Sequence, residues 1–165
     1  MPVNLELKAR IHSSSRVFRT LKEMGSESEK LVQTDTYFRV MKGRLKLREC
    51  VGGKTELIYY TRNERGGHRW SNYRILPVAD SQRTKGFLSE VFGVSKVVRK
   101  TRRVYYYKGE ARIHIDKVRG MGMFIEFEVF CRGNRKKAVV LYNYLIKRFE
   151  IKKKDLIRSS YADLG

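Results

Sequence analysis

The sequence predicts an α+β domain that consists mainly of antiparallel strands. Alternation of apolar and polar residues with a period of two, the pattern of half-buried strands, dominates the 165-residue chain. Short glycine-containing turns separate several of these segments, as is usual where neighbouring strands run antiparallel. Apolar residues follow a helical spacing in only a few stretches. We therefore expect eight strands and about three helices in a single domain that covers residues 1–165.

The first half of the chain is expected to hold five of the strands and one helix. Residues 3–12 alternate, with Leu5 and Leu7 on the apolar face. The pattern of residues 13–25 predicts a helix, with serines at its start and a glycine at its end. A loop is expected at residues 65–68. The other strands of this half are expected at residues 31–41, 44–51, 56–62 and 73–78.

The second half is expected to hold the other three strands and two helices. Asp80 is a suitable cap for a helix that ends at Gly93. Asn134 is placed to cap the last helix, which should extend to about residue 150. A short segment at 155–164 then ends the sequence. The strands of this half are expected at residues 95–107, 111–118 and 124–131.

The chain carries a strong positive charge. It has 37 Lys and Arg residues against 17 Asp and Glu residues, which gives a formal net charge of +20. This balance indicates a polyanionic partner, either nucleic acid, an anionic membrane surface or a phosphorylated small molecule. A disordered basic tail is excluded, because 41% of the residues are apolar and 12% are aromatic.

Other features of the composition bear on the compartment. No apolar run approaches the roughly 18 residues of a membrane span, and the N-terminal residues lack the apolar region of a secretory signal. The two cysteines, Cys50 and Cys131, make neither a disulfide scaffold nor a zinc cluster, which favours a reducing compartment. We therefore expect a cytoplasmic protein, with the nucleus as the alternative, that is a monomer or a homodimer without a membrane partner.

The polar faces of the predicted strands are unusually rich in charge. A single face such as that of Lys46 and Arg48 is common on a solvated sheet, but here the pattern recurs over six or seven strands. The opposite faces are apolar and need helices to cover them. These features fit a closed eight-stranded antiparallel barrel with a charged lumen, wide enough for one small ligand. Lys and Arg would hold phosphate oxygens, and carboxylates would hold Mg²⁺ or Mn²⁺.

The order of several motifs resembles that of a known family. Residues 4–10, Asn-Leu-Glu-Leu-Lys-Ala-Arg, resemble the ExExK signature of the CYTH family, also called the triphosphate tunnel metalloenzymes. Similar segments continue in order at residues 33–38, 43–49, 56–62, 98–102, 113–116, 124–128 and 160–164. The resemblance covers essentially the whole chain and is closest to the CyaB-like, or class IV adenylate cyclase-like, branch. It implies an eight-stranded tunnel that holds a triphosphate together with one or two Mg²⁺ or Mn²⁺ ions.

The resemblance also implies roles for individual residues. Metal-binding carboxylates are matched by Glu6, Asp116, Glu126 and Glu128. Catalysis is implied for Glu6, Lys8, Glu126 and Glu128. Phosphate-binding positions are matched by Lys8, Arg10, Lys46, Arg48, Arg62, Arg74, Lys100 and Arg102. Tyr161 lies in the C-terminal segment that acts as a lid on one tunnel mouth. Asn4 departs from the signature, because it offers a neutral oxygen where the first Glu would stand, and this weakens one side of the metal site.

Three functions remain open from the sequence. The leading hypothesis is metal-dependent hydrolysis of a triphosphate, with ATP, another nucleoside triphosphate, thiamine triphosphate or tripolyphosphate as substrate. The alternative reaction is cyclisation of ATP to cyclic AMP and pyrophosphate, which the same tunnel could support. The third hypothesis is a catalytically weak tunnel protein that binds RNA or polyphosphate. Asn4 motivates it, as do surface basic segments at residues 135–137, 147–148 and 152–154.

Overall fold

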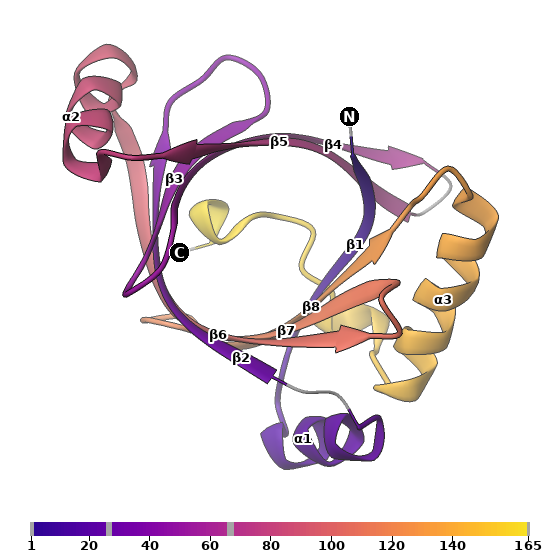
Figure 1. Ribbon diagram of the computed structural model, residues 1–165. Helices are drawn as coiled ribbons and strands as arrows, with labels where there is room; N and C mark the ends of the chain where they lie inside the picture. The colour runs from indigo at the N-terminus through magenta and orange to yellow at the C-terminus, as the bar shows by residue number, and fades with distance from the viewer. Residues whose placement is uncertain (1, 26–27, 66–67, 165) are drawn as a thin grey trace.

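Eight strands close into a barrel in the computed structural model, which describes residues 2–25, 28–65 and 68–164 (Figure 1). Neighbouring strands all run antiparallel, in the order β1-β5-β4-β3-β2-β6-β7-β8 and back to β1. The strands are β1 (Val3–Arg10), β2 (Ser28–Phe38), β3 (Arg44–Cys50), β4 (Thr55–Arg65), β5 (His68–Val78), β6 (Val94–Tyr107), β7 (Ala111–Val118) and β8 (Gly122–Phe130). The predicted α+β class and the closed antiparallel barrel are confirmed.

Strand β1 closes the barrel because it pairs with β5 on one side and with β8 on the other. Glu6 therefore lies opposite Arg69 of β5 and Glu128 of β8. Closure leaves no free strand edge, and alternate residues of each strand point into the lumen. The charged N-terminal signature thus forms part of the lumen wall.

Three helices lie on the outside of the barrel, as predicted (Figure 1). They are α1 (Ser14–Glu23), α2 (Ser81–Phe92) and α3 (Arg135–Arg148). The predicted caps of α2 and α3 are both present: Asp80 accepts a hydrogen bond from the backbone N of Arg83 at 2.9 Å, and Asn134 accepts one from the backbone N of Lys137 at 3.0 Å. Among the described residues, no helix has the length and apolar character needed to cross a membrane.

The main apolar core lies outside the barrel wall, between the strands and two of the helices. Leu5, Ile113 and Phe127 point outward from β1, β7 and β8 and are fully buried. They pack in one cluster with Leu145 of α3 and Leu21 of α1. Complete burial of one such side chain contributes about 1.5–3 kcal/mol. Because the outer face of these strands is occupied by the core, their polar face is left to line the lumen.

Three strands have other limits than the alternation predicts. Strand β2 is shifted to Ser28–Phe38 from the expected residues 31–41, whereas β4 is longer and continues to Arg65, and β5 begins at His68 rather than at residue 73. Residues 66–67 of the expected loop lie outside the described part of the chain. Strands β4 and β5 pair along their whole length, from Thr55 opposite Val78 to Arg65 opposite His68. This pairing is a tertiary interaction, which a weak local pattern does not reveal.

The C-terminal segment enters the barrel and fills one end of it. After α3, the chain runs beside β1, where the backbone N of Ile157 donates a hydrogen bond to the carbonyl oxygen of Lys8 at 2.8 Å. A short 3₁₀ helix, η2 (Tyr161–Asp163), then lies inside the ring of strands (Figure 1). The centre of the Tyr161 ring lies 5.0 Å from the centre of the Phe124 ring, and Phe124 has no exposed surface. One end of the lumen is therefore closed by aromatic side chains.

Candidate active site in the barrel lumen

The lumen is a cavity of about 610 Å³ lined by charged side chains from every strand. Nine cations line it: Lys8, Lys46, Arg48, Lys54, Arg62, Arg69, Lys100, Arg102 and Arg112. Five carboxylates line the same cavity, Glu6, Glu29, Glu56, Glu126 and Glu128, and two more, Asp35 and Asp116, are fully buried behind the cations. The nine cations thus exceed the seven carboxylates by two positive charges.

Asp35 of β2 is the counter-ion of three lumen cations. Its carboxylate accepts hydrogen bonds from Arg48 at 2.8 Å, Lys46 at 2.9 Å and Lys100 at 3.3 Å. Burial alone would raise the pKa of Asp35, but Arg48, Lys100 and Lys46 hold it well below its usual value. Asp35 therefore stays ionised and fixes these cations with their charges facing the cavity.

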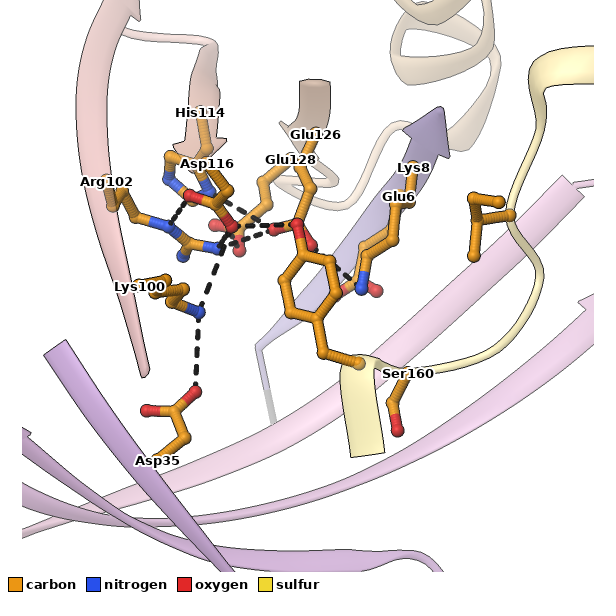
Figure 2. A network of polar contacts seen from close by, with 12 residues as sticks. Glu6, Lys8, Asp35, Lys100, Arg102, His114, Asp116, Glu126, Glu128 and Ser160 are labelled. Carbon is orange, nitrogen blue, oxygen red and sulfur yellow. Dashed lines mark hydrogen bonds and ion pairs between the residues drawn. The ribbon is translucent and has the colours of Figure 1, made fainter. Parts of the chain in front are cut away.

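A second network lies on the neighbouring strands β6, β7, β8 and β1 of the lumen wall (Figure 2). Arg102 donates to both oxygens of Asp116, at 2.7 and 2.6 Å, and to Glu126 at 2.7 Å. Lys100 lies 3.9 Å from Asp116, and Lys8 lies 3.0 Å from Glu126. The network continues the one around Asp35, so that acids and bases alternate across the wall. Such bidentate, charge-assisted contacts hold an Arg fork in a defined orientation.

Tyr161 completes this network at the closed end. Its hydroxyl donates a hydrogen bond to Asp116 at 2.9 Å, and the Lys8 Nζ lies 3.4 Å from the centre of its ring. Lys100 Nζ lies 5.3 Å from the same ring. These contacts are favourable because the ring face attracts cations. Tyr161 therefore closes this end of the lumen, and its ring also contacts two of the predicted phosphate-binding lysines.

The acidic residues expected to bind metal do not all come together. Glu6 faces Arg62 at 3.0 Å and Arg69 at 3.9 Å, and Asp116 is held by Arg102. The potential ligand atoms of His114, Glu126 and Glu128 instead lie within 4.8 Å of one another. His114 is not among the residues that the sequence analysis assigns to the metal site.

The His114 cluster fits a divalent cation. His114 Nδ1 is buried without a hydrogen bond, 3.5 Å from Glu126 and 3.9 Å from Glu128. Burial, together with Arg102, lowers the pKa of His114, which keeps the ring neutral near pH 7 with a lone pair available for an ion. Glu128 Oε2 also lacks a hydrogen bond, although it lies 2.6 Å from Arg112 Nη2. One imidazole with two carboxylates suits Mn²⁺ better than Mg²⁺, which prefers oxygen ligands.

Two of the predicted phosphate-binding residues do not line the lumen. Arg10 is exposed beyond the closed end, where it donates to the carbonyl oxygen of Met121 at 2.8 Å. Arg74 is exposed on the outer face of β5, since its neighbours Tyr73 and Ile75 are the ones that line the cavity. Arg69 of the same strand faces the lumen instead.

Sequence reasoning missed several charged residues of the lumen, among them Arg69, Asp35 and Arg112. Arg69 was missed because the start of β5 was placed too late, although its alternation with Ser71 and Tyr73 could have revealed it. Asp35 lies in a segment that resembles the family, yet no role was given to it. Arg112 of β7 likewise received no role. The remaining predicted residues, Glu6, Lys8, Lys46, Arg48, Arg62, Lys100, Arg102, Asp116, Glu126, Glu128 and Tyr161, lie in or directly behind the lumen wall.

A closed eight-stranded barrel with a cationic lumen and an inserted C-terminal plug defines a tunnel protein for anionic ligands. The chain belongs to the CYTH family, because residues 3–161 match the model of the CYTH domain. It is 26% identical to a Methanocaldococcus jannaschii protein whose name assigns it provisionally as an adenylate cyclase, over 98% of both chains.

Several solved structures have the same fold as this chain. The PH1012 protein of Pyrococcus horikoshii OT3 aligns with a TM-score of 0.87 and 21% identity, over 98% of each chain. HpAC1 of Hippeastrum, provisionally named an adenylyl cyclase and described as having a dominant triphosphatase activity, aligns with a TM-score of 0.69 and 15% identity. That alignment covers 98% of this chain and 93% of HpAC1. At these identities, the two structures establish the fold alone.

We predict that Asp35→Asn destabilises the ligand-free protein and increases its response to polyanions. The change leaves three cations without their shared counter-ion, and removal of one partner from a buried ion pair costs about 3–5 kcal/mol. Thermal melts with and without tripolyphosphate would measure both effects. Tripolyphosphate should raise the melting temperature of the variant more than that of the wild type. The control is Glu23→Gln, which breaks an exposed pair with Arg148 and should cost less than about 1 kcal/mol. Equal stability of Asp35→Asn and wild type would contradict this account of the lumen.

A second prediction concerns the pH dependence of polyanion binding. Burial, with Arg102, lowers the pKa of Lys100 to about 8, against the opposing effect of Asp35. Above this pH the empty site loses the Lys100 proton, whereas a bound polyanion favours the charged form. Binding should therefore take up a proton, and affinity for tripolyphosphate should fall between pH 7 and pH 9 by up to about tenfold per pH unit.

The comparison that tests this is Lys100→Arg, whose guanidinium keeps its charge in this range. Calorimetric titrations without metal, at several pH values, give the slope for both proteins. Titration of tripolyphosphate itself contributes the same pH dependence to both proteins. Only the difference between the slopes of the wild type and of Lys100→Arg is therefore assigned to Lys100. Identical slopes would show that Lys100 does not titrate on binding.

Proposed function

We propose that the protein is a divalent-metal-dependent triphosphatase that binds an organic triphosphate, with a nucleoside triphosphate as the leading substrate, in the lumen. The observation that carries the proposal is the excess of lumen cations over carboxylates, held with their charges facing one enclosed cavity. A triphosphate supplies the compensating negative charge in a compact form, and Lys and Arg bind its oxygens directly. Membership of the CYTH family and the activity described for HpAC1 support this assignment.

The chain's own residues position the phosphates and compensate their charge. Lys8, Lys100 and Arg102 surround the network next to the closed end, where they would stabilise charge that develops on a terminal phosphate. Asp35 and Asp116 keep these cations in place before a ligand enters. The Tyr161 plug limits how far a phosphate chain can advance and keeps bulk water out of that end.

A metal ion in this lumen would be held by Glu126, Glu128 and His114. When bound, Mg²⁺ or Mn²⁺ supplies further charge neutralisation and lowers the pKa of a coordinated water. Asn4 is buried in the lining at 4% exposure and offers a neutral oxygen beside this set. The donor set supports one ion more strongly than two.

The open mouth favours an organic triphosphate over inorganic tripolyphosphate. Tyr106 and Ile75 line the mouth and are 52% and 43% exposed, and Tyr73 lies on the same rim. Exposed aromatic and apolar side chains in a charged cavity are suited to contact a base or another ring. With the triphosphate in the cationic middle of the lumen, the organic group would lie at this mouth.

Cyclisation of ATP is the second candidate reaction. The name of the relative at 26% identity supports it, and the same lumen can hold ATP for either reaction. The products distinguish the two, since cyclisation releases cyclic AMP and pyrophosphate, whereas hydrolysis of the terminal phosphate releases orthophosphate. A catalytically weak tunnel that only binds polyanions is the third candidate, which Asn4 supports.

A substrate panel with product identification tests the proposed function. ATP, GTP, thiamine triphosphate and tripolyphosphate are incubated with Mg²⁺ or Mn²⁺, with a chelator control. We expect metal-dependent release of orthophosphate, reduced at least about a hundredfold in a Glu126→Gln, Glu128→Gln double variant. Phosphate release no faster than in that variant would contradict the hydrolase, and cyclic AMP as the main product would replace it with the cyclase.

We further predict that Tyr106→Ala separates organic from inorganic substrates. Loss of an aromatic contact worth about 0.5–1.5 kcal/mol should raise the KM for ATP by about two- to twelvefold and leave the KM for tripolyphosphate unchanged. Steady-state kinetics with both substrates measure the difference. Tyr144→Ala is the matched control, because Tyr144 is 44% exposed and lies on α3, outside the lumen. An equal effect on both substrates would remove Tyr106 from substrate recognition.

A further inference from the structure

A second concentration of positive charge lies on the outer wall of the barrel, where β2, β6 and the end of β7 run side by side. We call it the outer patch, and it consists of Lys30, Arg99, Arg103, Lys117 and Arg119. All five side chains are exposed, and none forms an ion pair with another residue in the described part of the chain. Arg103 also lies over the ring of Phe18, at 5.4 Å.

The strand register brings these like charges together. Lys30 lies directly opposite Arg103, and Lys117 lies opposite Thr101, between Arg99 and Arg103 of the neighbouring strand. The backbone N of Arg119 donates to the carbonyl oxygen of Arg99 at 2.9 Å, which places Arg119 beside the same group. Like charges at facing positions are destabilising. No carboxylate occupies an outward position next to them among the residues the structure describes, so an external anion would relieve the repulsion.

A shallow groove with a neutral floor runs through the outer patch. Its lining includes Val32, Thr34 and Thr101 in addition to three of the cations. Val32 and Val97, on the same face, are 47% and 40% exposed. The floor can contact sugars or bases, and the threonine hydroxyls can donate to phosphate oxygens.

The spacing of the charges favours a nucleic acid over inorganic polyphosphate. Outward residues along one strand are about 6.8 Å apart, and neighbouring strands about 4.8 Å apart. Adjacent phosphates of polyphosphate share an oxygen and are closer together than this, whereas those of a nucleic acid are separated by a sugar. The patch lies on paired strands of the barrel wall, and a flexible single strand can follow such a surface with its phosphates at the cations, which favours a single strand.

The basic segments near the C-terminus are less suitable. Lys137 pairs with Glu110, Arg148 pairs with Glu23, and Arg135 lies 5.0 Å from the ring of Trp70. Their charges are therefore partly compensated within the chain. We infer that the outer patch binds the phosphate backbone of a single-stranded nucleic acid, at a site separate from the lumen and independent of the proposed triphosphatase activity.

Fluorescence anisotropy with labelled 20-nucleotide single-stranded RNA and DNA tests the inference. Saturating tripolyphosphate is added to occupy the lumen, and the salt concentration is varied. The association constant of a single strand falls with salt with a slope of about −0.7 per phosphate contacted, so five contacts predict a slope near −3.5 in the logarithm of the association constant against log salt. The two labelled strands show whether the site distinguishes RNA from DNA.

The triple variant Arg99→Ala, Arg103→Ala, Lys117→Ala should weaken binding at least tenfold and reduce the magnitude of the slope by about 2. The matched control, Lys136→Ala, Lys152→Ala, Lys153→Ala, removes the same charge near the C-terminus and should change affinity less than threefold. The charge-conserving variant Arg99→Lys, Arg103→Lys should keep most of the affinity, and thermal melts confirm that each variant is folded.

Three results would overturn the inference. They are the absence of salt-dependent binding to either strand, an equal loss in the control variant, and displacement of the strand by tripolyphosphate at concentrations that fill only the lumen. Tighter binding of duplex DNA or of long-chain polyphosphate than of single strands would likewise assign a different partner. None of these outcomes depends on whether the protein hydrolyses triphosphates.

Discussion

The structure depends on how a closed barrel tolerates many like charges inside it. Two fully buried carboxylates, Asp35 and Asp116, each hold a pair or more of the cations that line the lumen. Without them, the desolvated Lys and Arg side chains would repel one another in a medium that screens charge poorly. With them, the cations are fixed in position and remain partly uncompensated. A site of this kind is organised before an anion arrives, which reduces the reorganisation needed on binding.

The same constraint explains the unusual position of the apolar core. In a small barrel, side chains usually fill the interior. Here the interior is polar, so the apolar residues of β1, β7 and β8 face outward and need α1 and α3 to cover them. Among the described residues, the apolar cluster inside the ring lies around Phe124 and Tyr161, at the end that the C-terminal segment closes. The division between core and site thus follows from which face of the strands carries charge.

Much of this arrangement could be predicted from the sequence, because a period of two fixes the face of each residue once a strand is recognised. Lys46 and Arg48, or Lys100 and Arg102, were assigned to the lumen on that basis. Where the strand limits were misjudged, the assignment failed, and Arg74 was chosen in place of Arg69. Contacts such as that between Asp35 and Lys100, 65 residues apart, depend on the strand order. The clustering of His114 with Glu126 and Glu128 also needs the paired register of β7 and β8.

The net charge of +20 has two physically different parts. The lumen, with the two carboxylates buried behind its cations, contributes two of these positive charges, which leaves 18 for the rest of the molecule. Lumen cations are paired and enclosed, so they act on a ligand that has already entered. The outer patch has no carboxylates beside it in the described chain, and its field extends into solvent over about one Debye length, roughly 8 Å at physiological salt. An approaching polyanion therefore meets the charge of the outer wall first. Strand β6 carries cations on both of its faces, since Lys100 and Arg102 point into the lumen and Arg99 and Arg103 point outward. The proposed tunnel chemistry uses the inward set, and the outward set is the part of the charge for which we infer a separate partner.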